Sequence, residues 1–131
     1  MLTIPEDITP IELATSTIWF DETGILCAIS KKKPQQTVEE AKASMAELLR
    51  IIGSEKVCLL IDVTHASENT REIRSYAAEE LPKIVKALAL VSSSVLGKMV
   101  ANLFFQLKSQ PYPVKMFNDE TEAREWLKKF L

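Results

Sequence analysis

Side chains that are common in hydrolytic active sites follow the predicted strands of this sequence. The continuous apolar run at 57–61 and the segment 84–91 indicate strands that are buried on both faces. In open α/β sheets, ligands bind beyond the carboxyl ends of such strands. The polar residues expected at those ends are Asp62, Thr64, His65, Ser92, Ser93, Ser94, Asn118 and Asp119. Because a serine, a histidine and an acid all occur among them, hydrolysis is the first chemistry to consider.

The pattern around these residues argues against catalysis. The nucleophilic serine of α/β hydrolases lies in a Gly-x-Ser-x-Gly turn, and the sequence has no such motif. The three glycines are isolated from one another, which excludes a glycine-rich phosphate loop. His65 is the single histidine and falls in a polar loop, where an exposed structural role is more common than a catalytic one. We therefore expect no catalytic residues and no enzymatic activity.

The three serines at 92–94 precede a predicted helix, and Lys98 follows in its first turns. One interpretation is that Ser92, Ser93 and Ser94 cap this helix. The other is that they bind an anion at the helix N-terminus together with Lys98. The sequence leaves both interpretations open.

The cysteines predict a cytoplasmic protein without a metal site. Cys27 and Cys58 lie in apolar runs, where buried reduced thiols are the favoured interpretation and a disulfide is the alternative. Neither belongs to a Cys-x-x-Cys pair, so we expect no zinc, no other metal and no cofactor.

The stretch Met1–Asp7 has no basic region followed by a long apolar run, and no run of eighteen apolar residues occurs. We expect a cytoplasmic location and no transmembrane segment.

Length and charge predict one domain that does not bind nucleic acid. The chain has 131 residues, of which 47% are hydrophobic, and a formal net charge of −2. This length suits a single domain over 1–131, in which residues 1–10 form a lead-in segment. The absence of a basic excess argues against nucleic-acid partners.

Local patterns predict the order ββαβαβαβα. The turn Asp21–Gly24 separates two strand-like runs and is typical of a β-hairpin. A capping box of Thr37 and Glu40 starts the first helix, and Asn69 is expected to cap the second. The sequence thus predicts an α/β fold, with an N-terminal β-hairpin and alternating β-α units forming a mostly parallel five-stranded sheet covered by four helices. The predicted strands cover 11–20, 25–30, 57–61, 84–91 and 114–117, and the helices cover 38–52, 69–81, 95–107 and 119–131.

The helix predicted over 95–107 has more apolar surface than one sheet face can cover. Its polar side chains form one narrow stripe, and the apolar remainder spans about 240° of its circumference, where packing on one sheet face needs about 100–140°. The expected interaction surface consists of Val95, Met99, Ala101, Phe104 and Phe105. Cover could come from the final helix, or from Leu2, Ile4 and Ile8 of the lead-in segment. The alternatives are a homodimer partner, a different protein or a hydrophobic ligand.

The second half of the chain carries residues that resemble a known family. They are Val85–Ser93, Gly97, Asn102, Phe104, Pro113–Lys115, Phe117–Glu120, Ala123 and Trp126–Leu127. With these residues and the element order, the chain resembles the STAS-domain superfamily, the fold of the anti-sigma-factor antagonist SpoIIAA. Within it, the chain is similar to small bacterial proteins described as SpoIIAA-like or STAS/Sec14-type. Most of the matching positions are structural, so the resemblance implies a fold rather than an activity.

The resemblance also implies a candidate phosphorylation site. In STAS antagonists, a serine at the start of the helix after the second buried strand is phosphorylated by a partner kinase. The corresponding candidates here are Thr70 and Ser67, although Asn69 stands where the family motif has an aspartate and no glycine follows. The alternative is that Thr70 is an ordinary first-turn residue beside the Asn69 cap.

Two functions from different classes follow from the sequence. The first is a non-enzymatic, regulatory STAS-like module that binds a protein partner or forms a homodimer. The second is implied by the Sec14-type resemblance: a small protein that binds a lipid or another apolar ligand. Because the chain is short, any such ligand pocket would be small.

Overall fold

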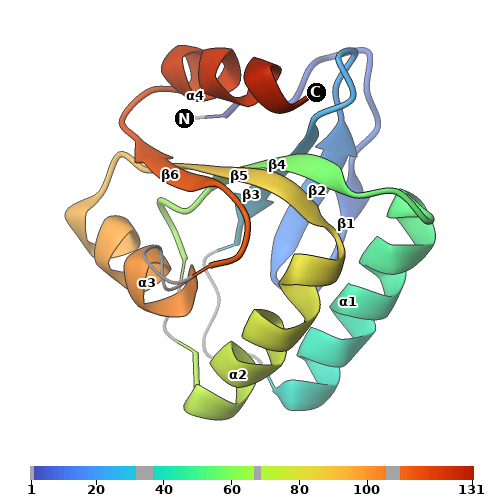
Figure 1. The fold of residues 1–131 in the computed structure, drawn as a ribbon, viewed down its shortest axis with the longest axis vertical. Helices are drawn as coiled ribbons and strands as arrows, with labels where there is room; N and C mark the ends of the chain where they lie inside the picture. Colours follow the sequence, from blue (N-terminus) through green and yellow to red (C-terminus); the bar gives the residue numbers. More distant parts are fainter. Residues whose placement is uncertain (1, 32–36, 67–68, 106–109) are drawn as a thin grey trace.

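A six-stranded sheet forms the centre of the molecule (Figure 1). The computed structural model describes residues 2–31, 37–66, 69–105 and 110–131, without the side chains at 104 and 105. The order of the strands in the sheet follows the chain, with β1, β2 and β3 antiparallel and β3 to β6 parallel. The strands are β1 (Ile11–Glu12), β2 (Ser16–Phe20), β3 (Leu26–Ser30), β4 (Val57–Asp62), β5 (Val85–Val91) and β6 (Val114–Phe117).

The sheet has six strands instead of the five that the sequence predicts. The segment predicted as one strand over 11–20 turns back on itself, and the N–H of Leu13 donates to the carbonyl of Ser16 at 2.8 Å. Ile11 therefore pairs with Ile18 across an antiparallel ladder. The β-branched residues on both sides of the turn satisfy a strand pattern throughout, so periodicity alone did not reveal the turn.

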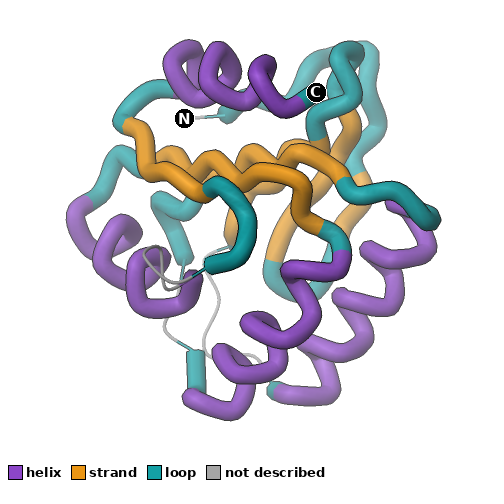
Figure 2. The backbone as a smooth tube through the Cα atoms, in the orientation of Figure 1, coloured by secondary structure: helices purple, strands orange, loops and turns teal. Residues whose placement is uncertain are grey.

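Helices cover both faces of the sheet. In Figure 1, α4 and the N-terminal segment lie over one face, and α1, α2 and α3 lie over the other. Figure 2 shows the strands as a layer between these two groups. The helices are α1 (Val38–Ile52), α2 (Arg71–Glu80), α3 (Val95–Phe105) and α4 (Glu120–Leu127), with short 3₁₀ turns at Leu81–Lys83 and Lys128–Phe130. None of the helices in the described ranges is long and apolar enough to cross a membrane.

Local sequence signals determine where several helices and turns begin and end. The predicted hairpin turn is confirmed, since Gly24 has a φ of +93° and the carboxylate of Asp21 accepts the N–H of Ile25 at 3.0 Å. The capping box is also confirmed, because Thr37 accepts the N–H of Glu40 at 3.1 Å and donates its own N–H to that side chain at 2.9 Å. The prediction for α2 is wrong by one residue, since Thr70 rather than its neighbour is the N-cap.

The two faces of the sheet carry separate apolar cores. The face under α1, α2 and α3 contains Ile18, Leu26, Leu59, Leu88 and Leu90. The face under α4 contains Leu2, Trp19, Cys27, Leu60, Ala89, Ala123 and Leu127. Neighbouring residues of β4 and β5 alternate between these cores, which explains why both strands are apolar over most of their length.

Candidate functional site

The serines at the end of β5 hold the start of α3 against the loop after β4. The Ser92 hydroxyl accepts the N–H of Ser94 at 3.0 Å and donates to the carbonyl of Ser94 at 2.9 Å. The Ser94 hydroxyl accepts the N–H of Gly97 at 2.8 Å and donates to the carbonyl of Thr64 at 3.1 Å. These bonds cap the first turn of α3, as in the capping interpretation of the serines.

Close contact between α3 and the neighbouring loop depends on Gly97. A Cβ atom added at this position would lie 2.4 Å from the carbonyl oxygen of Val63 and 2.8 Å from the hydroxyl of Ser92. No side chain fits at such a distance. Gly97 therefore sets the position of α3 and, with it, the direction of its outer face.

The groups predicted to bind an anion already have partners within the protein. Lys98 donates to the side-chain oxygen of Asn118 at 2.5 Å, so its ammonium holds the turn before α4. The N–H of Ser93 donates to the hydroxyl of Thr64 at 3.1 Å. An anion at this helix N-terminus stays a prediction, and it would have to displace these bonds.

Two further candidates at the strand ends, Asp62 and His65, have different surroundings. Asp62 is buried, and its carboxylate accepts the N–H of Leu2 at 3.1 Å and the N–H of Thr64 at 2.9 Å. Asp62 thus anchors the N-terminal segment, whereas His65 is exposed. In the described parts of the chain, no group of three or more His, Cys, Asp or Glu residues could hold a metal ion.

Thr70 lies where the resemblance predicts a phosphoacceptor. It is exposed, and its hydroxyl accepts the N–H of Ile73 at 3.3 Å as the cap of α2. Arg74 donates to the carbonyl of Asn69 at 2.5 Å. The second candidate, Ser67, lies outside the described residues. Phosphorylation of either residue stays a prediction.

The outer face of α3 is an exposed apolar surface. Val95 is 75% exposed, Leu96 66%, Met99 65% and Leu103 53%. At about 100° per residue, these four side chains lie within an arc of about 100° on one side of the helix. We call Val95, Leu96, Met99 and Leu103 the α3 stripe. Exposed apolar side chains that are contiguous, unlike scattered ones, mark interaction sites.

The predicted interaction surface is correct in part. Val95 and Met99 belong to the α3 stripe, but Ala101 is only 2% exposed and packs in the core under the sheet, so its assignment to the surface is wrong. The side chains of Phe104 and Phe105 lie outside the described part of the structure.

The chain does not cover the α3 stripe with its own termini. The N-terminal residues Leu2, Ile4 and Ile8 pack in the same core as Ala123 and Leu127 of α4. Figure 1 shows α4 and the N-terminal segment on the face of the sheet opposite α3. The expectation that the lead-in segment or the last helix packs on α3 is therefore wrong.

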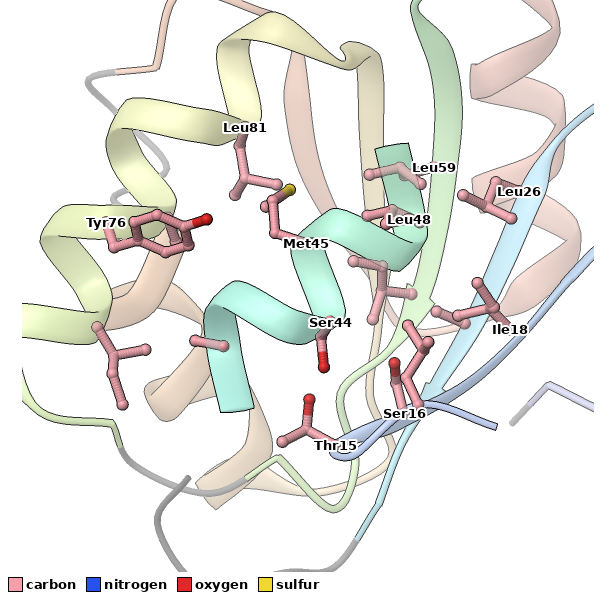
Figure 3. Close-up of a pocket in the computed structure, with 16 residues that line it drawn as sticks. Thr15, Ser16, Ile18, Leu26, Ser44, Met45, Leu48, Leu59, Tyr76 and Leu81 are labelled. Atoms are coloured by element: carbon pink, nitrogen blue, oxygen red, sulfur yellow. The ribbon is translucent and has the colours of Figure 1, made fainter. Parts of the chain in front are cut away.

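A pocket separates α1 from the sheet (Figure 3). It has a volume of about 180 Å³ and lies between α1, α2 and the first strands. Its walls are apolar apart from Tyr76 and three residues with small hydroxyl side chains, Thr15, Ser16 and Ser44. We call this cavity the α1 pocket. No motif in the sequence indicates it, because it arises from the spacing between elements.

Comparison with known proteins gives a family and a fold. The family profile described as "Domain of unknown function (DUF7793)" matches residues 18–131. The chain belongs to this family. It is also similar to the crystal structure of an uncharacterised protein of the DUF3478 family with a SpoIIAA-like fold, from Shewanella loihica PV-4. The two are 20% identical with a TM-score of 0.59, over 86% of this chain and 91% of the other.

A second solved structure is more distant from this DUF7793 chain. It is a protein with unknown function from Arthrobacter sp. FB24, 25% identical over 85% of this chain and 97% of the other, with a TM-score of 0.32. No curated protein matches the chain. The SpoIIAA-like fold predicted from the sequence is thus confirmed, and the family description names no activity.

Two residues of the α3 stripe in this DUF7793 protein were missing from the predicted surface. Leu96 and Leu103 belong to the wide apolar arc of the helix. The apolar residues of that arc do not indicate which of them face the sheet. The position of Gly97 was the available signal, because a glycine in the middle of a helix is typical of a close approach to another element. Side chains opposite Gly97 must then point outward.

Proposed function

We propose that the protein is a non-enzymatic interaction module that self-associates through the α3 stripe. The observation that carries this proposal is the exposure of four large apolar side chains on one face of a single helix. Burial of apolar area is favourable by about 25 cal/mol per Å², so a partner that covers these side chains stabilises the assembly. Helix faces of this kind are recurrent docking surfaces.

The arrangement of the α3 stripe favours a second copy of the chain as the partner. Val95 and Leu103 lie four positions before and after Met99. A two-fold axis beside Met99 would place two α3 helices antiparallel. Met99 would then face the partner's Met99, and Val95 would face the partner's Leu103. Such a self-complementary contact is what a closed two-fold dimer requires.

The charges of α3 also favour self-association over a charged partner. The segment Val95–Phe105 contains one charged residue, Lys98, which lies off the stripe and donates to Asn118. Two copies would therefore meet without opposing like charges. An acidic or basic partner would find no complementary charge on this stripe.

The same residues support a role without catalysis. The hydroxyls of Ser92 and Ser94 cap α3, and the carboxylate of Asp62 binds two backbone amides. The proposal includes a cytoplasmic location, which is supported by Cys27 and Cys58, both buried thiols without a disulfide.

Light scattering coupled to size-exclusion chromatography, over a hundredfold range of concentration, tests the proposal. We expect the wild-type protein to show the mass of a dimer, and Met99→Lys to show the mass of a monomer with an unchanged circular dichroism spectrum. Leu131→Lys is a matched control, since Leu131 is an exposed apolar residue outside α3 and its replacement should leave the dimer intact. A wild-type monomer at all concentrations would overturn the proposal.

A further inference from the structure

We propose that the α1 pocket binds a small, uncharged amphiphile, namely one ring or a short branched chain that carries a single hydroxyl or carbonyl group. The pocket lies between α1, α2 and the sheet and shares no residue with the α3 stripe. This ligand site is therefore independent of self-association.

The size of the α1 pocket limits the ligand to about one ring. Its volume is about 180 Å³. An apolar protein cavity of about 150 Å³ stays dry and binds benzene. The α1 pocket therefore accommodates a six-membered ring with one or two further atoms. A phospholipid or a long acyl chain would extend beyond this volume.

The sizes of the side chains that line the α1 pocket leave its centre open. Large side chains of the sheet, such as Leu26 and Leu59, form one wall. Met45 and Leu48 of α1 also line the pocket, and Figure 3 shows Leu48 next to Leu59. Small residues at other lining positions, Ala28, Ala41 and Ala77, leave the centre open.

The packing of α1 also differs from that of the other helices on this face. None of its fifteen residues, all of which the structure describes, is fully buried. Its ends are nevertheless well specified, because the capping box of Thr37 and Glu40 starts the helix and Gly53 ends it with a φ of +79°. Because α1 is well formed but half-exposed along its apolar side, the space between this helix and the sheet is not filled by side chains. An apolar ligand supplies the missing contacts.

Hydroxyl groups at one end of the pocket determine the polar part of the ligand. Figure 3 shows the hydroxyls of Thr15 and Ser44 pointing toward one another, with Ser16 beside them. These three residues are half-buried and line the pocket. A hydroxyl group can both donate and accept, so this end matches a ligand hydroxyl or carbonyl.

The charges near the pocket exclude an ionic ligand. Tyr76 is the one residue with an ionisable side chain among the described residues that line it, and none of these residues carries a carboxylate, ammonium or guanidinium group. Lys31 lies beside the hydroxyl end, because its N–H donates to the carbonyl of Thr15 at 2.9 Å. Its ammonium is already bound to the Glu12 carboxylate at 2.8 Å and to the carbonyl of Leu13 at 2.8 Å. Lys42, two residues before Ser44, does not line the pocket. A carboxylate ligand would thus lose its hydration without gaining a counter-ion.

Binding of benzene, phenol and benzoate to the full chain at pH 7 tests the proposal. The measurement is chemical-shift perturbation in ¹H–¹⁵N spectra, with dissociation constants from titration. We expect phenol to bind about fivefold more tightly than benzene, because a hydrogen bond adds to the apolar contact. Benzoate should bind at least tenfold more weakly than phenol. The shifts should cluster at residues of β2, α1 and α2.

Substitutions distinguish binding in the α1 pocket from binding elsewhere on the protein. Ala41→Leu fills the pocket from α1 and should abolish binding of benzene and phenol. Ala43→Leu makes the same change on the exposed side of the same helix and should leave binding unchanged. Ala77→Val fills the pocket from α2 and serves as a second test if Ala41→Leu does not fold. Ser44→Ala should lower phenol affinity to that of benzene while leaving benzene affinity unchanged.

Three results would overturn the proposal. The first is the absence of pocket shifts with all three probes. The second is equal binding by Ala41→Leu and the wild type. The third is a preference for benzoate, which would replace the uncharged ligand with an anion. Equal affinities for benzene and phenol in the wild type would overturn the assignment of the polar end.

Discussion

The guanidinium of Arg124 in α4 forms an ion pair with the carboxylate of Asp21, which lies 103 residues earlier in the turn between β2 and β3. Asp21 also accepts the N–H groups of Thr23 at 2.8 Å and Ile25 at 3.0 Å. Arg124 lies 3.6 Å from the sulfur of Cys27 on the adjacent strand. This cluster joins the last helix to the hairpin on the face of the sheet opposite α3.

Acid should weaken the fold through Asp21. Burial opposes ionisation of this carboxyl, but hydrogen bonds from Thr23, Arg124 and Ile25 outweigh burial and hold the pKa of Asp21 below its usual value. Because the pKa is lower in the folded state, the stabilisation is complete above about pH 5 and is lost as the pH falls through the folded pKa. We expect the free energy of unfolding, from urea titrations at several pH values, to decrease toward pH 3. Asp21→Asn should show a smaller decrease, and an equal decrease would contradict this assignment.

Replacing Arg124, the partner of Asp21, by an uncharged residue should also lower the free energy of unfolding. Arg124→Met keeps much of the side-chain length but leaves the Asp21 carboxylate without its cation. We expect a loss of about 2 kcal/mol in the free energy of unfolding at pH 7, because hydrogen bonds to charged groups contribute about 1.5–3 kcal/mol. Lys128→Met, an exposed change in the next turn, should shift stability by less than about 0.5 kcal/mol. Similar losses in the two variants would show that the ion pair has no special role.

The thiol of Cys27 should be almost unreactive in the folded protein. Burial raises its pKa to about 11, although the charge of Arg124 opposes this increase. Burial also raises the pKa of Cys58. Since the thiolate is the reactive form, we expect slow modification by a disulfide reagent at pH 8 and rapid modification of both thiols in guanidinium chloride. Fast modification of the native protein would contradict the buried placement of these residues.

Replacement of Gly97 should disturb the position of α3. The Cβ of an alanine would lie 2.4 Å from the carbonyl oxygen of Val63, so the helix or the loop must move. We expect Gly97→Ala to lower the free energy of unfolding by about 1–3 kcal/mol, measured by urea titration. Asn102→Ala, at an exposed position of α3, is the control and should change stability by less than about 0.5 kcal/mol. A stable Gly97→Ala protein would contradict the close contact.

The cap of α2 can be tested separately from phosphorylation. Loss of the Thr70 hydroxyl should cost about 1 kcal/mol, because it accepts the N–H of Ile73. Thermal unfolding of Thr70→Ala should therefore occur at a lower temperature than that of Thr70→Ser, which retains the oxygen. Equal unfolding temperatures for the two variants would contradict the cap at Thr70.

Features that depend on neighbours in the sequence were largely predictable. The capping box of Thr37 and Glu40 and the turn ending at Gly24 are formed by backbone and side-chain groups that are three residues apart. The SpoIIAA-like fold followed from the order of these elements and from the family resemblance. The division of the segment at 11–20 into two strands was missed, because the pairing of Ile11 with Ile18 is not visible in a strand-like pattern.

The sequence by itself determined that α3 has more apolar surface than one sheet face can use. Only the tertiary structure decided which part of it stays exposed. The N-terminal segment and α4 pack on the other face of the sheet, and Gly97 directs the opposite side of α3 outward. The α1 pocket likewise has no sequence signal, because it depends on the distance between α1 and β2–β4 rather than on any single element. Apolar content is a property of the chain, whereas its exposure depends on contacts between residues that are distant in sequence.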